Sequence, residues 1–169
     1  MPDASEERAA IFEEAGNFCH RALHLRPARS GFATLETTYW CEVLRMARSV
    51  LIVDDSLAVR QALVRLFADG GFDVCGEAAS GREAIEKAQG LNPGLIVMDL
   101  SMPVMNGIEA ARCLRQLLPT VLIIILSDYG GLFPEQEARS LGIAAIVSKA
   151  ECSSVLLHEA RTLLCQTAA

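Results

Sequence analysis

Two stretches decide the fold: Val50-Leu-Ile-Val-Asp-Asp-Ser56 and Asp99-Leu-Ser-Met-Pro-Val-Met-Asn-Gly107. The first is a short aliphatic run that ends in two adjacent acids. The second begins with an acid that directly follows another such run, residues 95–98. Uninterrupted aliphatic runs of this length are typical of strands buried on both faces of a parallel sheet. Each of these acids therefore stands where a buried strand is expected to end.

The same pattern extends over the chain from residue 49 onward. Five short, nearly uninterrupted apolar runs alternate with segments whose apolar residues recur at helical spacing. The predicted strands are 50–53, 72–75, 95–98, 121–126 and 144–147. This alternation predicts an α/β fold with a doubly wound, five-stranded parallel sheet, right-handed crossovers and helices on both faces.

Residues that begin and end helices agree with this pattern. Ser80 with Glu83, and Asn106 with Glu109, have the spacing of capping boxes. The pair Gly70-Gly71 and Gly142 follow helical stretches, where a left-handed residue is favoured. Pro134 suits the first position of a helix.

Composition limits the class of protein. The chain has 169 residues, a net charge of −6, 51% hydrophobic and 21% charged residues, so it can bury a core. The acidic balance argues against direct nucleic-acid binding. The longest aliphatic run is far shorter than the ~20 residues of a membrane-spanning helix. Six cysteines lack metal-site or redox spacing. We therefore predict a cytoplasmic protein with reduced thiols and no membrane contact.

The first 48 residues differ from the rest. They contain no lysine and little regular period, although residues 3–25 have apolar positions at helical spacing. We predict that residues 1–48 form an N-terminal extension, either disordered or the product of a mis-assigned start, and that residues 49–169 form the domain. A docking helix at residues 3–25 is the alternative.

Polar side chains follow four of the five predicted strands: Asp54 and Asp55, Asp99, Ser127, and Lys149. Taken singly, each has an ordinary explanation as a helix cap, a turn residue or a surface lysine. In an open α/β sheet, however, the carboxyl ends of the strands meet at one edge, where ligands bind. Three carboxylates there repel one another unless a cation lies among them. Oxygen ligands without Cys or His favour Mg²⁺ over zinc.

This set of residues suits phosphoryl chemistry. Mg²⁺ held by one or two carboxylates keeps waters and commonly meets a phosphate. Lys149 and Ser127 would then neutralise and hydrogen-bond the phosphoryl oxygens. Asp99 would remain as a carboxylate nucleophile that takes the phosphoryl group as an aspartyl phosphate.

At this point the chain resembles a known family, the receiver domain of bacterial two-component response regulators. The resemblance spans roughly residues 49–166, a range typical of one domain. It rests on the two opening stretches together with Ile125-Leu-Ser127 and Val147-Ser-Lys149. It implies a flavodoxin-like sheet, Asp99 as phosphoacceptor, Ser127 as the switch hydroxyl and Lys149 as the phosphate-pairing lysine.

The resemblance also implies the metal ligands. Asp55 would hold Mg²⁺ directly and Asp54 partly through water, together with Asp99 and the backbone carbonyl of Ser101. Two positions depart from the family pattern: Ile146 stands where an aromatic residue is usual, and Ala150 stands where proline is usual. The first departure leads us to expect weaker coupling between Ser127 and the output face.

The function implied is a phosphorylation-activated signalling module of a two-component phosphorelay, and not an enzyme with turnover. A histidine kinase or phosphotransfer protein would phosphorylate Asp99. A downstream protein, or a second copy in a homodimer, would bind the face built from residues 132–141, 144–148 and 152–164. No output domain is recognisable after Lys149, so we expect a stand-alone receiver.

Two alternatives remain. A Mg²⁺-dependent phosphohydrolase on a similar sheet commonly has a second catalytic aspartate two residues after the nucleophile. Here that position is Ser101, which argues against a phosphohydrolase. A pseudo-receiver that only binds its partners is disfavoured by the presence of Asp54, Asp55, Asp99 and Lys149 together. Incubation with a small phosphodonor separates these possibilities.

Overall fold

The computed structural model describes residues 48–128, 135–151 and 153–167. Within these ranges strands and helices alternate, and all neighbouring strands are parallel in the order β2-β1-β3-β4-β5. The elements are β1 (Ser49–Val53), α3 (Leu57–Asp69), β2 (Asp73–Ala78), α4 (Gly81–Leu91), β3 (Leu95–Asp99), α5 (Gly107–Leu117), β4 (Leu122–Ser127), α6 (Glu135–Ser140), β5 (Ala145–Ser148) and α7 (Ser153–Thr167). The predicted fold class is confirmed.

Two predictions fall on other parts of the chain. The N-terminal extension, apart from Arg48, lies outside the described residues, and so does Pro134. The division into residues 1–48 and 49–169 therefore stays a prediction.

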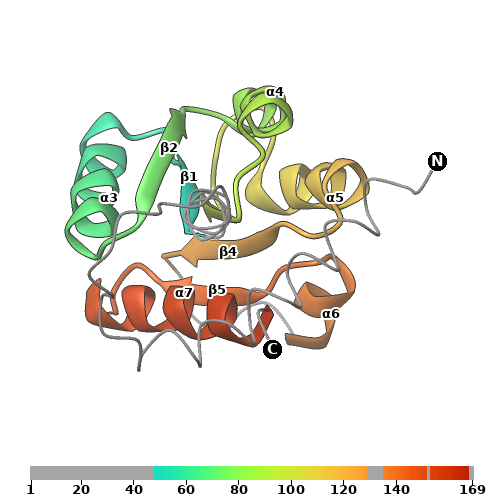
Figure 1. Cartoon of the computed structure of the whole chain (residues 1–169). Coiled ribbons are helices and arrows are strands. Elements are labelled where there is room, and N and C mark those ends of the chain that lie inside the picture. Colours follow the sequence, from blue (N-terminus) through green and yellow to red (C-terminus); the bar gives the residue numbers. More distant parts are fainter. Residues whose placement is uncertain (1–47, 129–134, 152, 168–169) are drawn as a thin grey trace, which may run out of the picture.

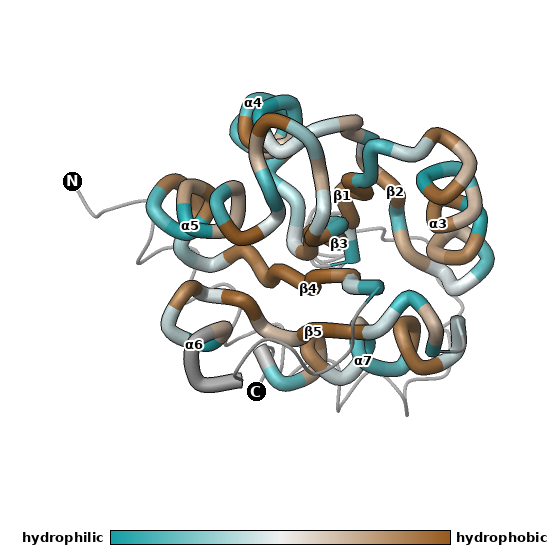
Figure 2. The backbone as a smooth tube through the Cα atoms, turned by 180° about the vertical axis from the view of Figure 1, so that it is seen from behind, coloured by the Kyte–Doolittle hydropathy of each residue, from teal (hydrophilic) through white to brown (hydrophobic). Residues whose placement is uncertain are grey.

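The sheet separates two apolar cores (Figure 1). On one face α3 and α7 cover alternate residues of the strands, with Phe67 and Ala160 fully buried. On the other face α4, α5 and α6 cover the remaining strand residues, with Ala84 and Leu114 fully buried. Figure 2 shows hydrophobic residues concentrated along the central strands. Because both faces are covered, β1 and β3 are buried throughout, as their aliphatic sequences predict.

The two edge strands correct one expectation. We predicted strands buried on both faces, but β2 and β5 are mostly half-buried, because each has a neighbour on one side only. Strand β2 also runs beyond the predicted residues 72–75. Gly76, Glu77 and Ala78 continue its pairing with β1, so main-chain pairing extends the strand past its apolar run.

Helix ends follow the predicted caps, with one difference. Asn106 and Glu109 form a complete capping box at the start of α5. The Ser80 side chain accepts a hydrogen bond from the Glu83 amide, but Glu83 returns its bond to the Ala79 amide instead of that of Ser80. Gly142 has a φ of +80°, as a left-handed C-cap requires.

The loop between β3 and α5 contains a strained residue. Val104 has a φ of +71° and is 95% exposed, so no packing of its branched side chain offsets the strain of this left-handed conformation. We expect Val104→Asn to raise the free energy of unfolding by about 1 kcal/mol, since Asn tolerates the left-handed region better. In thermal unfolding this is a rise in Tm of about 4 °C. Val104→Ala, which keeps a Cβ, is the control, and an Asn variant no more stable than the Ala variant would contradict the strain.

No helix in the described ranges combines the length and the apolar character needed to cross a bilayer. Among the described residues Cys75, Cys113 and Cys165 are free thiols, the first two half-buried and the third exposed.

Candidate functional site

Asp54 and Asp99 lie side by side at the carboxyl edge of the sheet because each follows or ends a central strand. Asp54 comes directly after β1, and Asp99 is the last residue of β3, the strand paired with β1. Both side chains are almost completely buried, although they are carboxylates. The Asp54 amide donates to the carbonyl of Ala78 at 3.1 Å, and Asp54 Oδ1 accepts from the Ser56 amide at 2.8 Å. The position of Asp54 is thus fixed by main-chain bonds on both sides.

Lys149 joins the two carboxylates. Its amide donates to the carbonyl of Ser127 at 2.8 Å, which places the residue at the end of β5 against the end of β4. Its ammonium then reaches across the sheet edge, 3.1 Å from Asp54 Oδ2 and 2.9 Å from Asp99 Oδ1. Ser127, the buried last residue of β4, pairs with Ser148 in register. The structure thus brings Asp54, Asp99, Ser127 and Lys149 to one edge of the sheet, and the part that each plays there stays a prediction.

Asp55 and Ser101 are placed differently from these four. Both are exposed, so they stand at the solvent side of the buried ion pairs. Ser101 follows Asp99 by two residues in the loop that leads to α5. Among the described residues no peptide bond is cis, so Lys149–Ala150 is trans.

The charges of the site are unequal. Asp54, Asp55 and Asp99 supply three carboxylates, and Lys149 supplies one ammonium in contact with two of them. Partial burial lowers the pKa of Lys149, but its contacts with Asp99 and Asp54 outweigh burial and hold that pKa above the usual value. Lys149 is therefore charged at neutral pH, and the site still carries excess negative charge.

One buried oxygen of the site has a single charged partner. Asp99 Oδ1 lies 2.9 Å from the Lys149 ammonium, and among the described residues no further donor reaches it. A buried carboxylate oxygen in this state is costly unless a further cation or donor approaches it. Hard oxygen donors with an excess of negative charge fit Mg²⁺.

The carboxylates do not form a complete cage by themselves. In the part of the chain that the structure describes, no three His, Cys, Asp or Glu side chains are grouped to hold a metal ion. Mg²⁺ usually takes one or two carboxylates and fills its other positions with water and phosphate oxygens, so a Mg²⁺ site at these residues stays a prediction.

The loop after Asp99 closes tightly against it. The Gly107 amide donates to the carbonyl of Leu100 at 2.9 Å, and the Leu100 amide donates to that of Leu126 at 2.8 Å. A Cβ on Gly107 would lie 2.5 Å from the Asp99 carbonyl oxygen, closer than real Cβ atoms come. Only glycine fits here, which explains the Asn106-Gly107 pair in the sequence.

The structure adds one residue that the sequence analysis did not select. Arg60, in the first turn of α3, donates through Nη1 to the carbonyl oxygen of Asp54 at 2.6 Å. The sequence offered one indication of this role: Arg60 lies six residues after Asp54, on the helix that directly follows the two acids.

Comparison with known proteins decides the family. A model of the response regulator receiver domain matches residues 50–161, about two thirds of the chain. The chain belongs to the response regulator receiver domain family. It is thus a receiver domain of the two-component signalling type.

Individual relatives agree with this assignment. Chemotaxis protein CheY of Thermotoga maritima is 42% identical over 104 residues, which cover 62% of this chain and 87% of that protein. Transcriptional activator protein ExaE of Pseudomonas putida is 35% identical over 117 residues, or 68% of this chain and 54% of that protein. The chain therefore spans most of the first relative but only about half of the second.

A solved structure shows the same fold. The complex of CheX and CheY with BeF3 and Mg²⁺ from Borrelia burgdorferi contains a chain with a TM-score of 0.62 and 27% identity. The alignment covers 68% of this chain and 87% of that one. The five-stranded parallel sheet with helices is thus the flavodoxin-like fold of receiver domains.

Proposed function

We propose that this receiver domain takes a phosphoryl group from a phosphohistidine donor onto Asp99, with Mg²⁺, and that the resulting aspartyl phosphate changes partner binding. The observation that carries the proposal is the buried Asp99 carboxylate at the end of β3, beside Asp54 and with the Lys149 ammonium 2.9 Å from Oδ1. An aspartate carboxylate can act as a nucleophile and form an aspartyl phosphate, and an adjacent ammonium would balance the charge of the phosphoryl oxygens.

Each residue has a distinct part in the transfer. An oxygen of Asp99 attacks phosphorus, the bond from phosphorus to the donor's imidazole nitrogen breaks, and the electron pair of that bond stays on the imidazole. Lys149 balances the charge on the phosphoryl oxygens, and the Ser127 hydroxyl donates to one of them. Asp55, Asp99 and the Ser101 carbonyl, with Asp54 partly through water, would hold Mg²⁺, and the bound ion would neutralise charge between the carboxylates and the phosphoryl group.

The comparisons support this proposal at the level of the family. The Borrelia CheY complex combines the same fold with BeF3 and Mg²⁺. The proposed donor for this chain is a histidine kinase or a phosphotransfer protein, and the cytoplasm is the compartment that we propose. The domain acts as a signalling module and not as an enzyme with turnover.

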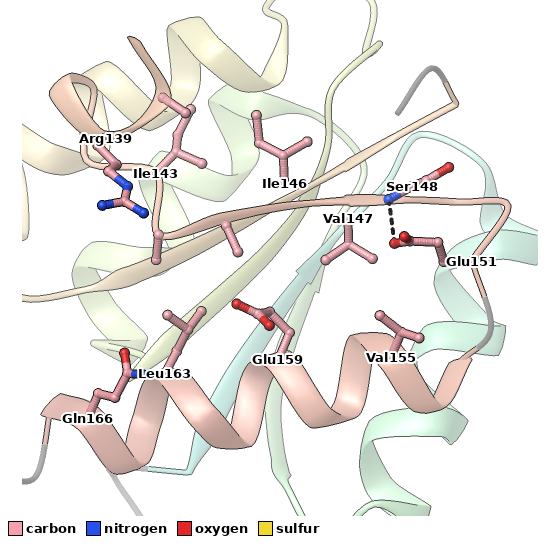
Figure 3. Close-up of a pocket in the computed structure, with 13 residues that line it drawn as sticks. Arg139, Ile143, Ile146, Val147, Ser148, Glu151, Val155, Glu159, Leu163 and Gln166 are labelled. Atoms are coloured by element: carbon pink, nitrogen blue, oxygen red, sulfur yellow. Dashed lines mark hydrogen bonds between the residues drawn. The ribbon is translucent and has the colours of Figure 1, made fainter. Parts of the chain in front are cut away.

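The proposed output surface is the face of α6, β5 and α7. A groove of about 810 Å³ lies there, lined by residues from all three elements. Figure 3 shows Arg139 at one end of this groove, Glu151 at the other, and Glu159 of α7 between them. We propose that a downstream protein or a second copy of the chain binds this face. Ile146, which lines the groove from β5, replaces the usual aromatic residue, so the change in affinity on phosphorylation is expected to be small.

Incubation with phosphoramidate and Mg²⁺ tests the function. We expect the intact mass to rise by one phosphoryl group per chain, because the proposal assigns a single acceptor, Asp99. Sustained release of phosphate over many turnovers, without a stable adduct, would favour the phosphohydrolase. No adduct and no release would leave a pseudo-receiver and refute the proposal.

A further inference from the structure

The acid loop, residues 54–56, is held by a side chain that does not itself reach the carboxylates. Arg60 donates through Nη1 to the Asp54 carbonyl oxygen at 2.6 Å and through Nε to Glu77 Oε2 at 3.2 Å. The Arg60 side chain is 13% exposed. Two donors of one planar guanidinium thus bind two different elements at fixed angles.

We propose that Arg60 is a positioning residue for the Mg²⁺ site. It fixes the main chain of Asp54, and so the direction of the Asp54 and Asp55 carboxylates, without touching the metal. The inference rests on the proposed function, because it concerns the same site.

The contacts around Asp54 show why one side chain has this effect. The Asp54 amide is bound to β2 through Ala78, and its carbonyl is bound to Arg60. Both polar groups of this residue's main chain are therefore anchored, and Arg60 supplies one of the two anchors. Loss of the Arg60 bond leaves the Asp54 carbonyl without this partner, and the bond from the Ser56 amide to Asp54 Oδ1 then holds the segment that carries Asp55 less firmly.

Glu77 braces Arg60 from the other side. It lies on β2, opposite Ile52 of β1, and its carbonyl accepts from Lys87 Nζ at 2.6 Å. Lys87 also pairs with Glu83 at 2.8 Å, so α4 is tied to the same point. The guanidinium therefore rests on a residue that two further elements hold in place.

A simple charge effect predicts the opposite result, which makes the proposal testable. Arg60 carries a positive charge near the acid loop, and a positive charge repels Mg²⁺. If charge alone mattered, removal of Arg60 would tighten Mg²⁺ binding. If positioning matters, the same removal weakens it, because ligands that are no longer pre-oriented must be ordered when the ion binds.

The experiment is a calorimetric titration of the full chain with MgCl2, without phosphodonor. We expect Arg60→Met to raise the Kd for Mg²⁺ about tenfold, the size usual for residues that orient metal ligands. Arg60→Lys keeps the positive charge but loses the planar guanidinium with its two donors, and we expect it to raise the Kd for Mg²⁺ as well. Arg65→Met is the matched control, because Arg65 is an exposed arginine of the same helix, and its Kd should stay within about twofold.

Further measurements keep the result interpretable. Thermal unfolding without Mg²⁺ identifies a variant that has simply lost its fold. In that event Glu77→Gln is the variant to measure, because it weakens only the contact between Glu77 and Arg60. It should also raise the Kd for Mg²⁺. Equal or tighter Mg²⁺ binding by the folded Arg60 variants would overturn the positioning role. Absence of Mg²⁺ binding by the wild-type chain would instead overturn the proposed function.

Discussion

Asp99→Asn is expected to abolish phosphorylation by phosphoramidate and Mg²⁺, with a loss of several orders of magnitude in rate. An amide oxygen is a poor nucleophile towards phosphorus, and loss of a nucleophile removes most of the rate acceleration. The fold should persist, because asparagine has the same size. The remaining Asp54–Lys149 contact at 3.1 Å is then a balanced pair of one anion and one cation. The measurement is intact mass after incubation, together with thermal unfolding.

Asp55→Asn is the matched control for that experiment. Asp55 is an exposed carboxylate of the same site, and our proposal makes it a metal ligand and not the phosphoacceptor. Its substitution should slow labelling through weaker Mg²⁺ binding, and excess Mg²⁺ should restore much of the rate. Labelling of the Asp99→Asn variant at the wild-type rate would show that another residue is the acceptor.

Lys149→Met should give the largest change in stability. The substitution leaves Asp54 and Asp99 buried side by side without the ammonium that contacts both. Breaking a buried ion pair in this way costs about 3 kcal/mol or more. We expect a lower Tm in EDTA and a partial recovery with Mg²⁺, since the ion replaces part of the missing positive charge. Labelling of Asp99 should also fall.

The pH dependence of this effect has a definite sign. The pKa of Lys149 is raised in the folded chain despite partial burial, by contact with Asp99 and Asp54. A raised pKa contributes stability that is fully present below the unfolded value of about 10.4 and is lost as pH rises through the folded value. The difference in free energy of unfolding between the wild-type chain and Lys149→Met should therefore be constant near neutral pH and shrink only in strong alkali.

Lys87→Met is the control, because Lys87 is the only other lysine in the sequence. Lys87 is exposed, and its contacts are a surface pair with Glu83 and a hydrogen bond to the Glu77 carbonyl, which together contribute about 1 kcal/mol. A Lys149→Met chain as stable as Lys87→Met, with no response to Mg²⁺, would contradict the central place given to the Lys149 ion pairs.

Strand ends explain how much of the site could be predicted from sequence. Asp54, Asp99, Ser127 and Lys149 each stand at the carboxyl end of a strand, and parallel strands bring such ends to one edge. The prediction therefore needed only the strand pattern. The depth of each side chain was not predictable, because adjacent residues such as Asp54 and Asp55 have the same chemistry but differ in burial.

Other features depend on contacts that the sequence does not reveal. Arg60 donates its hydrogen bond to a main-chain oxygen, and every residue has one, so the sequence does not show which residue accepts the bond. The left-handed Val104 runs against the preference of branched side chains, so local propensity predicts the wrong conformation there. The half-buried edge strands follow from the strand order, which alternation alone does not determine.

The acceptor residue can be identified directly. Sodium borohydride reduces an aspartyl phosphate to homoserine, with hydride as the reductant and phosphate as the leaving group. After labelling, reduction and trypsin digestion, Asp99 lies in the peptide of residues 88–112, where it is the only aspartate, whereas Asp54 and Asp55 lie in residues 49–60. We expect homoserine at position 99, only when Mg²⁺ was present. Homoserine in residues 49–60, or at position 99 equally in EDTA, would contradict the account.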